Sequence, residues 1–150
     1  VNEWRTAAML RSFCFFKAGK EAKALEFAEL LYMAQEVLNP RNLSESAAAG
    51  SVAAALFAGD GKVYRGVCID MPCGMGFCAE HSAAAAMVTA GESRVIQMVA
   101  VGEDGRVAPP CGRCREFIRQ LHRENGECLV LIGEGEVKSL SELLPFGWEG

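Results

Sequence analysis

Apolar residues recur at helical spacing in the first third of the chain. In residues 20–38, "KEAKALEFAELLYMAQEVL", they include Phe27, Leu30, Leu31, Ala34 and Leu38, which would share one face of a helix. An Asn-Pro pair follows at once and is typical of a helix end. The pattern therefore predicts an amphipathic helix over 20–38.

Two runs of strand-forming residues come next, "SVAAALFA" (51–58) and "KVYRGVCI" (62–69). They are separated by Gly59-Asp60-Gly61, and Asp-Gly between two such runs is a strong hairpin signal. We expect two antiparallel strands here.

The second half of the chain alternates helices with strands. A loop over 70–77 leads to a helix that begins near Cys78 and stops at Gly91, and a second helix begins at Cys111 and stops at Gly126. Apolar runs at 95–102 and 128–133 predict buried strands, and 139–144 a short helix. This order predicts an α/β fold with a mixed sheet covered by helices on both faces.

Length and charge exclude some classes of partner. The chain has 150 residues, 51% of them hydrophobic and 23% charged, with a net charge of −4, as expected for one globular domain. Its acidic balance argues against a nucleic-acid partner. No apolar stretch reaches the roughly 18–20 residues that cross a bilayer, so we expect no membrane partner.

The first residues differ in character from the rest. We divide the chain into an N-terminal extension of unclear role, 1–19, and a single domain, 20–150. The apolar patch in "AAMLRSFCFFKAGK" contains Arg11 and is followed by Lys17, an order unlike that of a secretory signal. A short docked helix, a loose tail and a targeting segment all stay open.

Seven cysteines are many for this length, and their number is odd. A secreted disulfide framework prefers an even count in a smaller chain, whereas a cytosolic chain more often uses a C-x-x-C motif for metal or redox chemistry. We expect reduced thiols and a cytoplasmic protein.

Three of these cysteines lie at predicted helix starts. Cys111 and Cys114 share the first turn of one helix, and Cys78 begins another. If the two helices pack side by side with their N-termini together, three thiolates converge on one metal ion. Three protein ligands leave zinc a fourth position for water, which is the pattern of catalytic sites. The alternatives are a structural zinc, buried free thiols and a redox C-x-x-C.

Glu80, two residues after Cys78, gives the site its chemistry. Its carboxylate could reach a water on the zinc and carry a proton to a substrate atom. The alternative is a first-turn carboxylate that stabilises the helix dipole. Together, Cys-x-Glu and Pro-Cys-x-x-Cys match the zinc motif of nucleobase deaminases.

With these motifs the chain resembles the cytidine deaminase family over residues 20–150, and within it the blasticidin S deaminase branch. The stretches "SVAAAL", "DGKVYRGV", "PCGRCRE" and "ELLPFGWEG" carry the likeness to that branch. The resemblance implies a three-layer α/β/α sandwich with a mixed five-stranded sheet, one zinc ion per chain, and a homotetramer with sites near the subunit interfaces.

The resemblance also implies hydrolytic deamination at ring carbon 4 of a cytosine base. Glu80 would protonate ring nitrogen 3 and then the leaving ammonia. The Ala79 N–H would hold the base carbonyl, the Pro109 carbonyl would face the amine, and Ser51 matches a substrate-contacting serine. Phe77 is expected to pack on the base or on the sheet.

Several positions depart from the family pattern. Cys68-Ile69-Asp70 stands where cytidine deaminases have Asn-x-Glu for the ribose hydroxyls, so Cys68 and Asp70 are candidate substrate contacts. His81 replaces an arginine that eases the negative charge of the site, and Arg115 is the other candidate for that task. Two further candidate substrate contacts, by analogy with the branch, are Arg106 and Trp148.

The sequence thus favours a zinc-dependent aminohydrolase acting on a cytosine nucleoside, such as cytidine or deoxycytidine, or on a cytosyl nucleoside antibiotic of the blasticidin S type. The alternatives are a deaminase of another aminated heterocycle, a modified cytosine or a polynucleotide, and a zinc-stabilised binding domain without enzymatic activity.

Overall fold

The computed structural model describes residues 24–148, so the predicted extension 1–19 lies outside the described residues. Helix α1 spans Phe27–Gln35, a shorter segment than the predicted 20–38. It ends because Val37 N–H and Leu38 N–H bond back to the carbonyls of Ala34 and Gln35, which tightens the last turn before Asn39-Pro40.

The predicted hairpin is confirmed by strands β2 (Ala48–Ala58) and β3 (Val63–Asp70), which pair antiparallel from Ala53↔Val67 to Phe57↔Val63. Asp60 organises the turn, since its carboxylate accepts hydrogen bonds from Lys62 N–H at 3.0 Å and Tyr64 O–H at 2.7 Å. Gly61 has a φ of +77°, a conformation that glycine adopts at little cost.

The mixed sheet has six strands, not the five expected. Hydrogen bonds join the strands in the order β1-β2-β4-β5-β6, and β3 also pairs with β2. Strand β4 (Val95–Gly102) runs antiparallel to β2, and β5 (Leu129–Leu131) runs parallel to β4. The strands β1 (Arg41–Asn42) and β6 (Val137–Ser139) were not predicted, because two or three residues are too few to show an alternating pattern.

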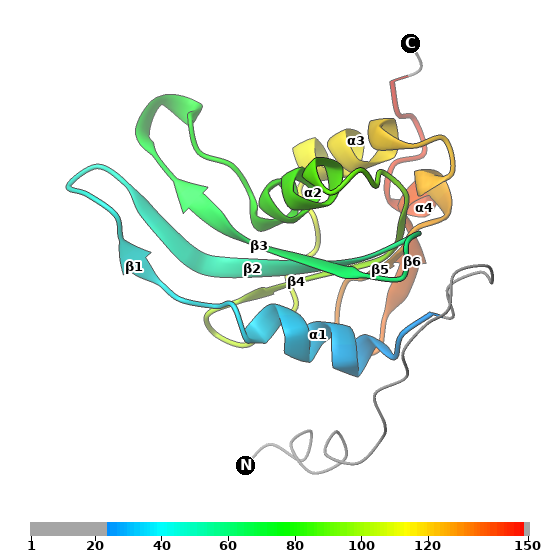
Figure 1. Ribbon diagram of the computed structural model, residues 1–150, viewed down its shortest axis with the longest axis horizontal. Helices are drawn as coiled ribbons and strands as arrows, with labels where there is room; N and C mark the ends of the chain where they lie inside the picture. Colours follow the sequence, from blue (N-terminus) through cyan, green and yellow to red (C-terminus); the bar gives the residue numbers. More distant parts are fainter. Residues whose placement is uncertain (1–23, 149–150) are drawn as a thin grey trace.

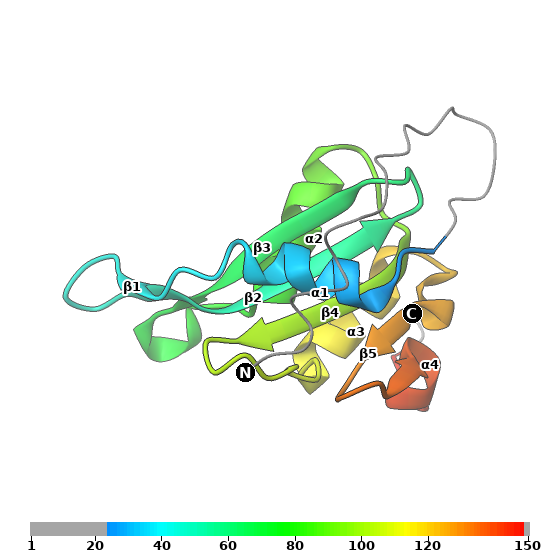
Figure 2. The same cartoon turned by 90° about the horizontal axis from the view of Figure 1, so that it is seen from below.

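Helices cover both faces of the sheet, which confirms the three-layer arrangement (Figures 1 and 2). Helix α1 lies on one face, and α2 (Ala79–Thr89), α3 (Gly112–Leu121) and α4 (Leu140–Leu143) lie on the other. The 3₁₀ turns η2 (Pro72–Gly74) and η3 (Asn125–Glu127) complete the elements. One apolar core lies under α1 and includes Leu30, Phe57 and Val99; the other includes Leu56, Met87, Met98, Ile118 and Leu140.

Helix α3 ends at Leu121, four residues before the end that the sequence predicts, because His122 is extended (φ −154°, ψ 141°). The following turn is tied to the sheet by Asn125, which is fully buried. Its side-chain oxygen accepts from Val95 N–H at 2.8 Å, and its amide donates to the carbonyls of Ser93 and Ile118. Asn125 thereby joins the end of α3 to the start of β4.

Small residues bring α2 very close to β3. Ala83 and Ala84 are fully buried, and a Cβ on Gly66 would collide with the backbone of Ser82 and Ala83. The alanine run therefore serves close packing, which sets the height of α2 above the sheet. Within residues 24–148, no helix is long and apolar enough to span a membrane.

We expect Gly66→Ala to lower the free energy of unfolding by about 2–3 kcal/mol, because the added methyl group must push α2 away from β3. Denaturant unfolding measures this loss. The matched control is Gly133→Ala, whose new methyl group would meet only the Glu136 side chain at 3.9–4.0 Å. Equal stability of the two variants would contradict the close approach.

Candidate active site

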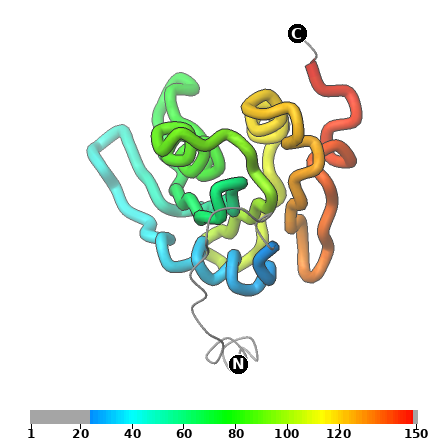
Figure 3. Tube along the Cα trace, turned by 45° about the vertical axis from the view of Figure 1, so that its right-hand side comes forward, coloured from blue at the N-terminus to red at the C-terminus, as the bar shows by residue number. Residues whose placement is uncertain are grey.

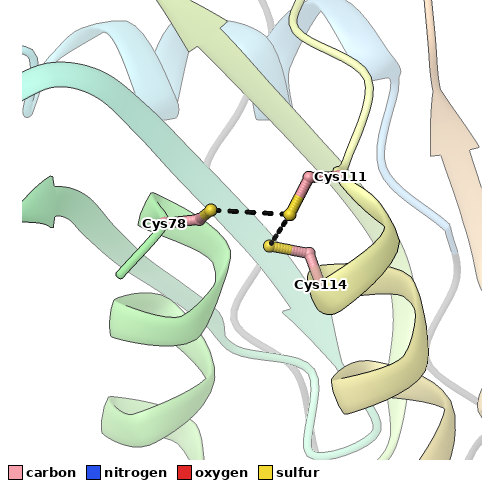
Figure 4. A group of neighbouring side chains, drawn as sticks. All are labelled: Cys78, Cys111 and Cys114. Atoms are coloured by element: carbon pink, nitrogen blue, oxygen red, sulfur yellow. Dashed lines mark hydrogen bonds between the residues drawn. The ribbon is translucent and has the colours of Figure 1, made fainter. Parts of the chain in front are cut away.

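Three cysteine sulfurs meet where α2 and α3 begin (Figure 4). Cys78 precedes the first residue of α2, Cys111 precedes that of α3, and Cys114 lies one turn into α3. The Cys111 Sγ is 3.6 Å from that of Cys78 and 3.5 Å from that of Cys114. The Cys78 side chain makes no capping hydrogen bond to its helix, and Cys78 and Cys111 both line the pocket described below, so both sulfurs are available to a ligand.

The spacing of the sulfurs fits a tetrahedral metal ion. Zinc–sulfur bonds of about 2.3 Å at tetrahedral angles place two sulfurs about 3.8 Å apart. All three sulfurs lie within 4.8 Å of one another. Cys114 is fully buried and Cys111 is exposed toward the pocket described below. The cluster can therefore hold one metal ion and leave one side of it open.

The surroundings shift the pKa values of the three thiols in different directions. Burial raises the pKa of Cys114, and the negative charge of Glu80 raises it further. Burial also raises the pKa of Cys78. Burial opposes ionisation of Cys111 too, but hydrogen bonds from Cys114 and from the Arg113 backbone bring its pKa below the ordinary value. Without a metal, Cys111 is thus the first of the three to become a thiolate.

Glu80 is a buried carboxyl group beside the cluster. It lies in the first turn of α2, is only 4% exposed, and lines the same pocket as Cys78 and Cys111. Burial raises its pKa above the usual range, although hydrogen bonds from its own backbone N–H and from Cys114 partly oppose the shift. A carboxyl group in this environment is suited to taking up and releasing a proton.

An open pocket of about 450 Å³ borders the cluster. The start of β2, the end of β3, the loop 70–77, and the segment before α3 form its walls. Six predicted substrate contacts line it together with Cys78, Glu80 and Cys111; they are Ser51, Cys68, Asp70, Phe77, Ala79 and Pro109. The structure thus brings these residues into one site.

One wall of the pocket is polar and linked through sulfur. The Cys68 Sγ lies 3.2 Å from Ser51 Oγ, accepts from Val52 N–H at 3.3 Å, and donates to Asp70 Oδ2 at 3.6 Å. Cys68 is buried and Asp70 is exposed. The thiol therefore contacts a carboxylate that lines the pocket.

The loop 70–77 is held against β3 by its own backbone. Phe77 N–H donates to the carbonyl of Ile69 at 2.9 Å, and Ile69 N–H donates to that of Phe77 at 3.0 Å. A Cβ on Gly76 would collide with the Ile69 carbonyl. This pairing places Phe77 at the pocket wall and fixes the backbone directly before Cys78.

His81 and Arg115 take different positions around the cluster. The His81 Nδ1 is 3.4 Å from Cys114 Sγ, and its ring stacks on Phe117 with centroids 4.2 Å apart. Burial lowers the pKa of His81, and the charge of Arg113 lowers it further, which favours the neutral ring. Arg115 instead donates to the carbonyls of Pro110 at 2.8 Å and Leu143 at 3.0 Å, which fixes the backbone before α3.

Arg106 and Trp148 do not line this pocket. The Arg106 side chain is 87% exposed and pairs with Asp104 at 3.3 Å in the turn after β4. Trp148 N–H donates to both carboxylate oxygens of Glu116, at 3.1 and 3.3 Å, which holds it beside the outer side of α3. Within one chain these two residues make no contact with the site.

Arg113 was not among the residues predicted from the sequence, but it lines the pocket, and its side chain donates to the Gly76 carbonyl at 3.4 Å. A signal was present, because Arg113 lies between the two cysteines of the C-x-x-C motif in the first turn of a predicted helix. Met71 also lines the pocket, and nothing in the pattern of the loop 70–77 singles it out.

Known proteins share this sequence and fold. The chain is 33% identical over 97 residues to a cytidine deaminase of Halalkalibacterium halodurans, covering 63% of this chain and 74% of that protein. It is 30% identical over 96 residues to a cytidine deaminase of Mycobacterium tuberculosis, covering 63% and 70%. No family model matches the chain.

Solved structures agree with these relatives. The crystal structure of the M. tuberculosis cytidine deaminase matches with a TM-score of 0.71 at 26% identity, over 84% of this chain and 99% of that one. That of the Burkholderia pseudomallei cytidine deaminase matches with a TM-score of 0.66 at 26% identity, over 83% and 100%. The shared fold, the relatives and the cysteine cluster agree: this chain belongs to the cytidine deaminase family of zinc-dependent aminohydrolases.

Proposed function

We propose that the protein hydrolyses the exocyclic amine of a cytosine nucleoside, or of a cytosyl nucleoside antibiotic of the blasticidin S type, with one zinc ion per chain held by Cys78, Cys111 and Cys114. One observation carries this proposal. A buried carboxyl group, Glu80, faces a pocket beside a three-cysteine cluster that is open on that side. The cytosine substrate follows from the names of the relatives.

The reaction exchanges an amine for an oxygen. Water adds to ring carbon 4, the bond from that carbon to the amine breaks, and the products are a uracil base and ammonia. The zinc ion, when bound, supplies an activated water. Glu80 would take a proton from the water and deliver it to ring nitrogen 3. It would then take the proton of the hydroxyl group now on ring carbon 4 and pass it to the departing amine, which leaves as ammonia. Burial raises the pKa of Glu80, so its carboxylate is a stronger proton acceptor than an exposed one.

Backbone groups at the two helix starts would orient the base. Ala79 is the first residue of α2 and lines the pocket, and the N–H groups of a helix's first turn lack partners within the helix. We assign that of Ala79 to the base carbonyl and the carbonyl of Pro109 to the amine. Phe77 would pack against the ring.

The opposite wall would hold the sugar. The Asp70 carboxylate accepts hydrogen bonds, and Cys68 is already engaged with Ser51, Val52 and Asp70. The Asp70 carboxylate on this wall would therefore accept hydrogen bonds from the hydroxyl groups of the sugar. His81, as a neutral ring beside Cys114, would hydrogen-bond one thiolate, while Arg115 would keep the segment before α3 in place.

The remaining assignments concern the whole protein. We propose a domain over 20–150 that assembles as a homotetramer, in which Arg106 reaches substrate only in a neighbouring subunit's site. The exposed Val88 of α2 and Phe146, 95% exposed, are apolar surfaces suited to such contacts.

The six cysteines of the described residues are free thiols, in keeping with a cytoplasmic protein.

We expect the purified protein to hold about one zinc ion per chain. Cys78→Ala should weaken zinc binding more than about 100-fold, because it removes a ligand rather than an outer partner. Metal analysis after dialysis measures this, with Cys73→Ala as the control, since Cys73 is exposed and outside the cluster. In the chelated protein Cys111 should react with iodoacetamide before the buried Cys114. Retention of zinc by Cys78→Ala would contradict the ligand set.

Ammonia release should be tested on cytidine, deoxycytidine, 5-methylcytidine, blasticidin S and free cytosine. We expect turnover of at least one, and a fall in kcat of about 10²–10⁴-fold in Glu80→Gln with zinc retained. Glu127→Gln, at an exposed carboxylate outside the pocket, should be unchanged. A zinc-loaded protein silent on every compound would overturn the substrate class and favour another aminated heterocycle.

If cytidine is a substrate, Asp70→Asn should raise its KM about 10- to 100-fold with little change in kcat, because a charged acceptor for a sugar hydroxyl is lost. The matched comparison is 2′,3′-dideoxycytidine, which lacks those hydroxyls and should respond little to the substitution. The assignment of Asp70 fails if both compounds lose affinity equally.

A further inference from the structure

A second groove, outside the candidate active site, lies between the later turns of α3 and the chain after α4. Its volume is about 540 Å³, more than that of the pocket beside the cysteines. In Figures 1 and 3 the chain after α4 runs back beside α3. We call this the tail groove; the residues that line it include Arg119, His122, Arg123, Ser141, Pro145 and Trp148.

Gly126, which is buried, lies close to two residues that line the tail groove, Ser141 and Arg119. A Cβ on Gly126 would lie 2.5 Å from Ser141 Oγ and 3.3 Å from Arg119 Nε. Only glycine lets the hydroxyl and the guanidinium approach the backbone from two sides. Arg119 is thereby held half-buried in the groove instead of extending freely into solvent.

The polar groups of the tail groove are mainly donors. Among the described residues Arg119 forms no ion pair, and its one hydrogen bond is a long 3.5 Å contact to the Arg123 carbonyl. The His122 Nδ1 accepts from Glu124 N–H at 3.2 Å, so Nε2 carries the ring proton. Ser141 adds a hydroxyl. Such a set fits an anion with several oxygens.

Carboxylates near the groove are already engaged. Glu124 is 3.8 Å from Arg123 but only 2.9 Å from Arg94. Glu116 accepts from Trp148 N–H and, at 2.6 Å, from Gln120. Among residues 24–148, no carboxylate lines the groove. In a chain of net charge −4, a groove with two arginines and no lining acid is a local reversal of charge.

An aromatic ring lies beside these cations. Trp148 is 68% exposed, and its backbone is anchored on Glu116. An anchored indole beside arginines can stack on a planar ring whose attached phosphate reaches the guanidinium groups. We propose that the tail groove binds a nucleoside 5′-phosphate, with the phosphate on Arg119, Arg123 and His122 and the base on Trp148.

The test is titration of the zinc-loaded full chain with 5′-AMP, read by tryptophan fluorescence. The chain has two tryptophans, Trp4 and Trp148, so Trp148→Phe identifies the source of the signal. We expect saturable quenching by 5′-AMP that Trp148→Phe removes. Adenosine and inorganic phosphate alone should need at least about tenfold higher concentrations, because each makes only part of the contact.

Arg119→Gln should raise the half-saturating concentration of 5′-AMP at least about tenfold. Arg123→Gln should do the same, and its side chain is 88% exposed, so folding is not at risk. Arg65→Gln, at an exposed arginine paired with Glu36, is the matched control and should bind normally.

The proposal is overturned if 5′-AMP causes no saturable change, if Arg123→Gln binds as well as Arg65→Gln, or if phosphate alone binds as tightly as 5′-AMP. None of these readings depends on deamination. The assignment of the tail groove and that of the cysteine pocket therefore succeed or fail separately.

Discussion

The parallel pairing of β4 with β5, through Gln97↔Leu129 and Met98↔Val130, is the constraint on which the site depends. Helix α2 leads into β4 and α3 leads into β5. Because the two strands point the same way and both helices lie on the same face, both helix N-termini lie at the same end of the sheet (Figure 4). That end is also where parallel strands place ligand sites in open α/β sheets.

Small residues allow the close packing that brings the cysteine sulfurs of the two helices within reach of one metal ion. Gly66 and the buried Ala83 let α2 lie almost on β3, and Asn125 ties the end of α3 to β4. With both helices fixed, the Cys111 and Cys78 sulfurs come within 3.6 Å. Neighbouring thiolates repel one another, so a metal ion or retained protons must compensate. The packing of the two helices therefore fixes where the three sulfurs lie, and the charge of the cluster is left to a metal ion or to protons.

The pocket combines an apolar approach with polar groups at opposite walls. Glu80 is buried next to the sulfurs, whereas Asp70 is exposed and oriented through Cys68. Burial raises the pKa of Glu80. One group is thus suited to moving protons and the other to accepting hydrogen bonds, a division of roles set by environment rather than by residue type.

The sequence alone determined the α/β class, the hairpin around Asp60, and the two helix starts with their cysteines and Glu80, because these rest on local signals of spacing, turn residues and motif. It did not reveal β1 and β6, which are too short for a pattern, or the early end of α3, which depends on the long-range contacts of Asn125. Only the tertiary structure decided that Arg115 donates hydrogen bonds to backbone carbonyls and that His81 stacks on Phe117. It also showed that Arg106 and Trp148 lie outside the pocket while Arg113 lines it, because the surroundings of a side chain are made by segments distant in sequence.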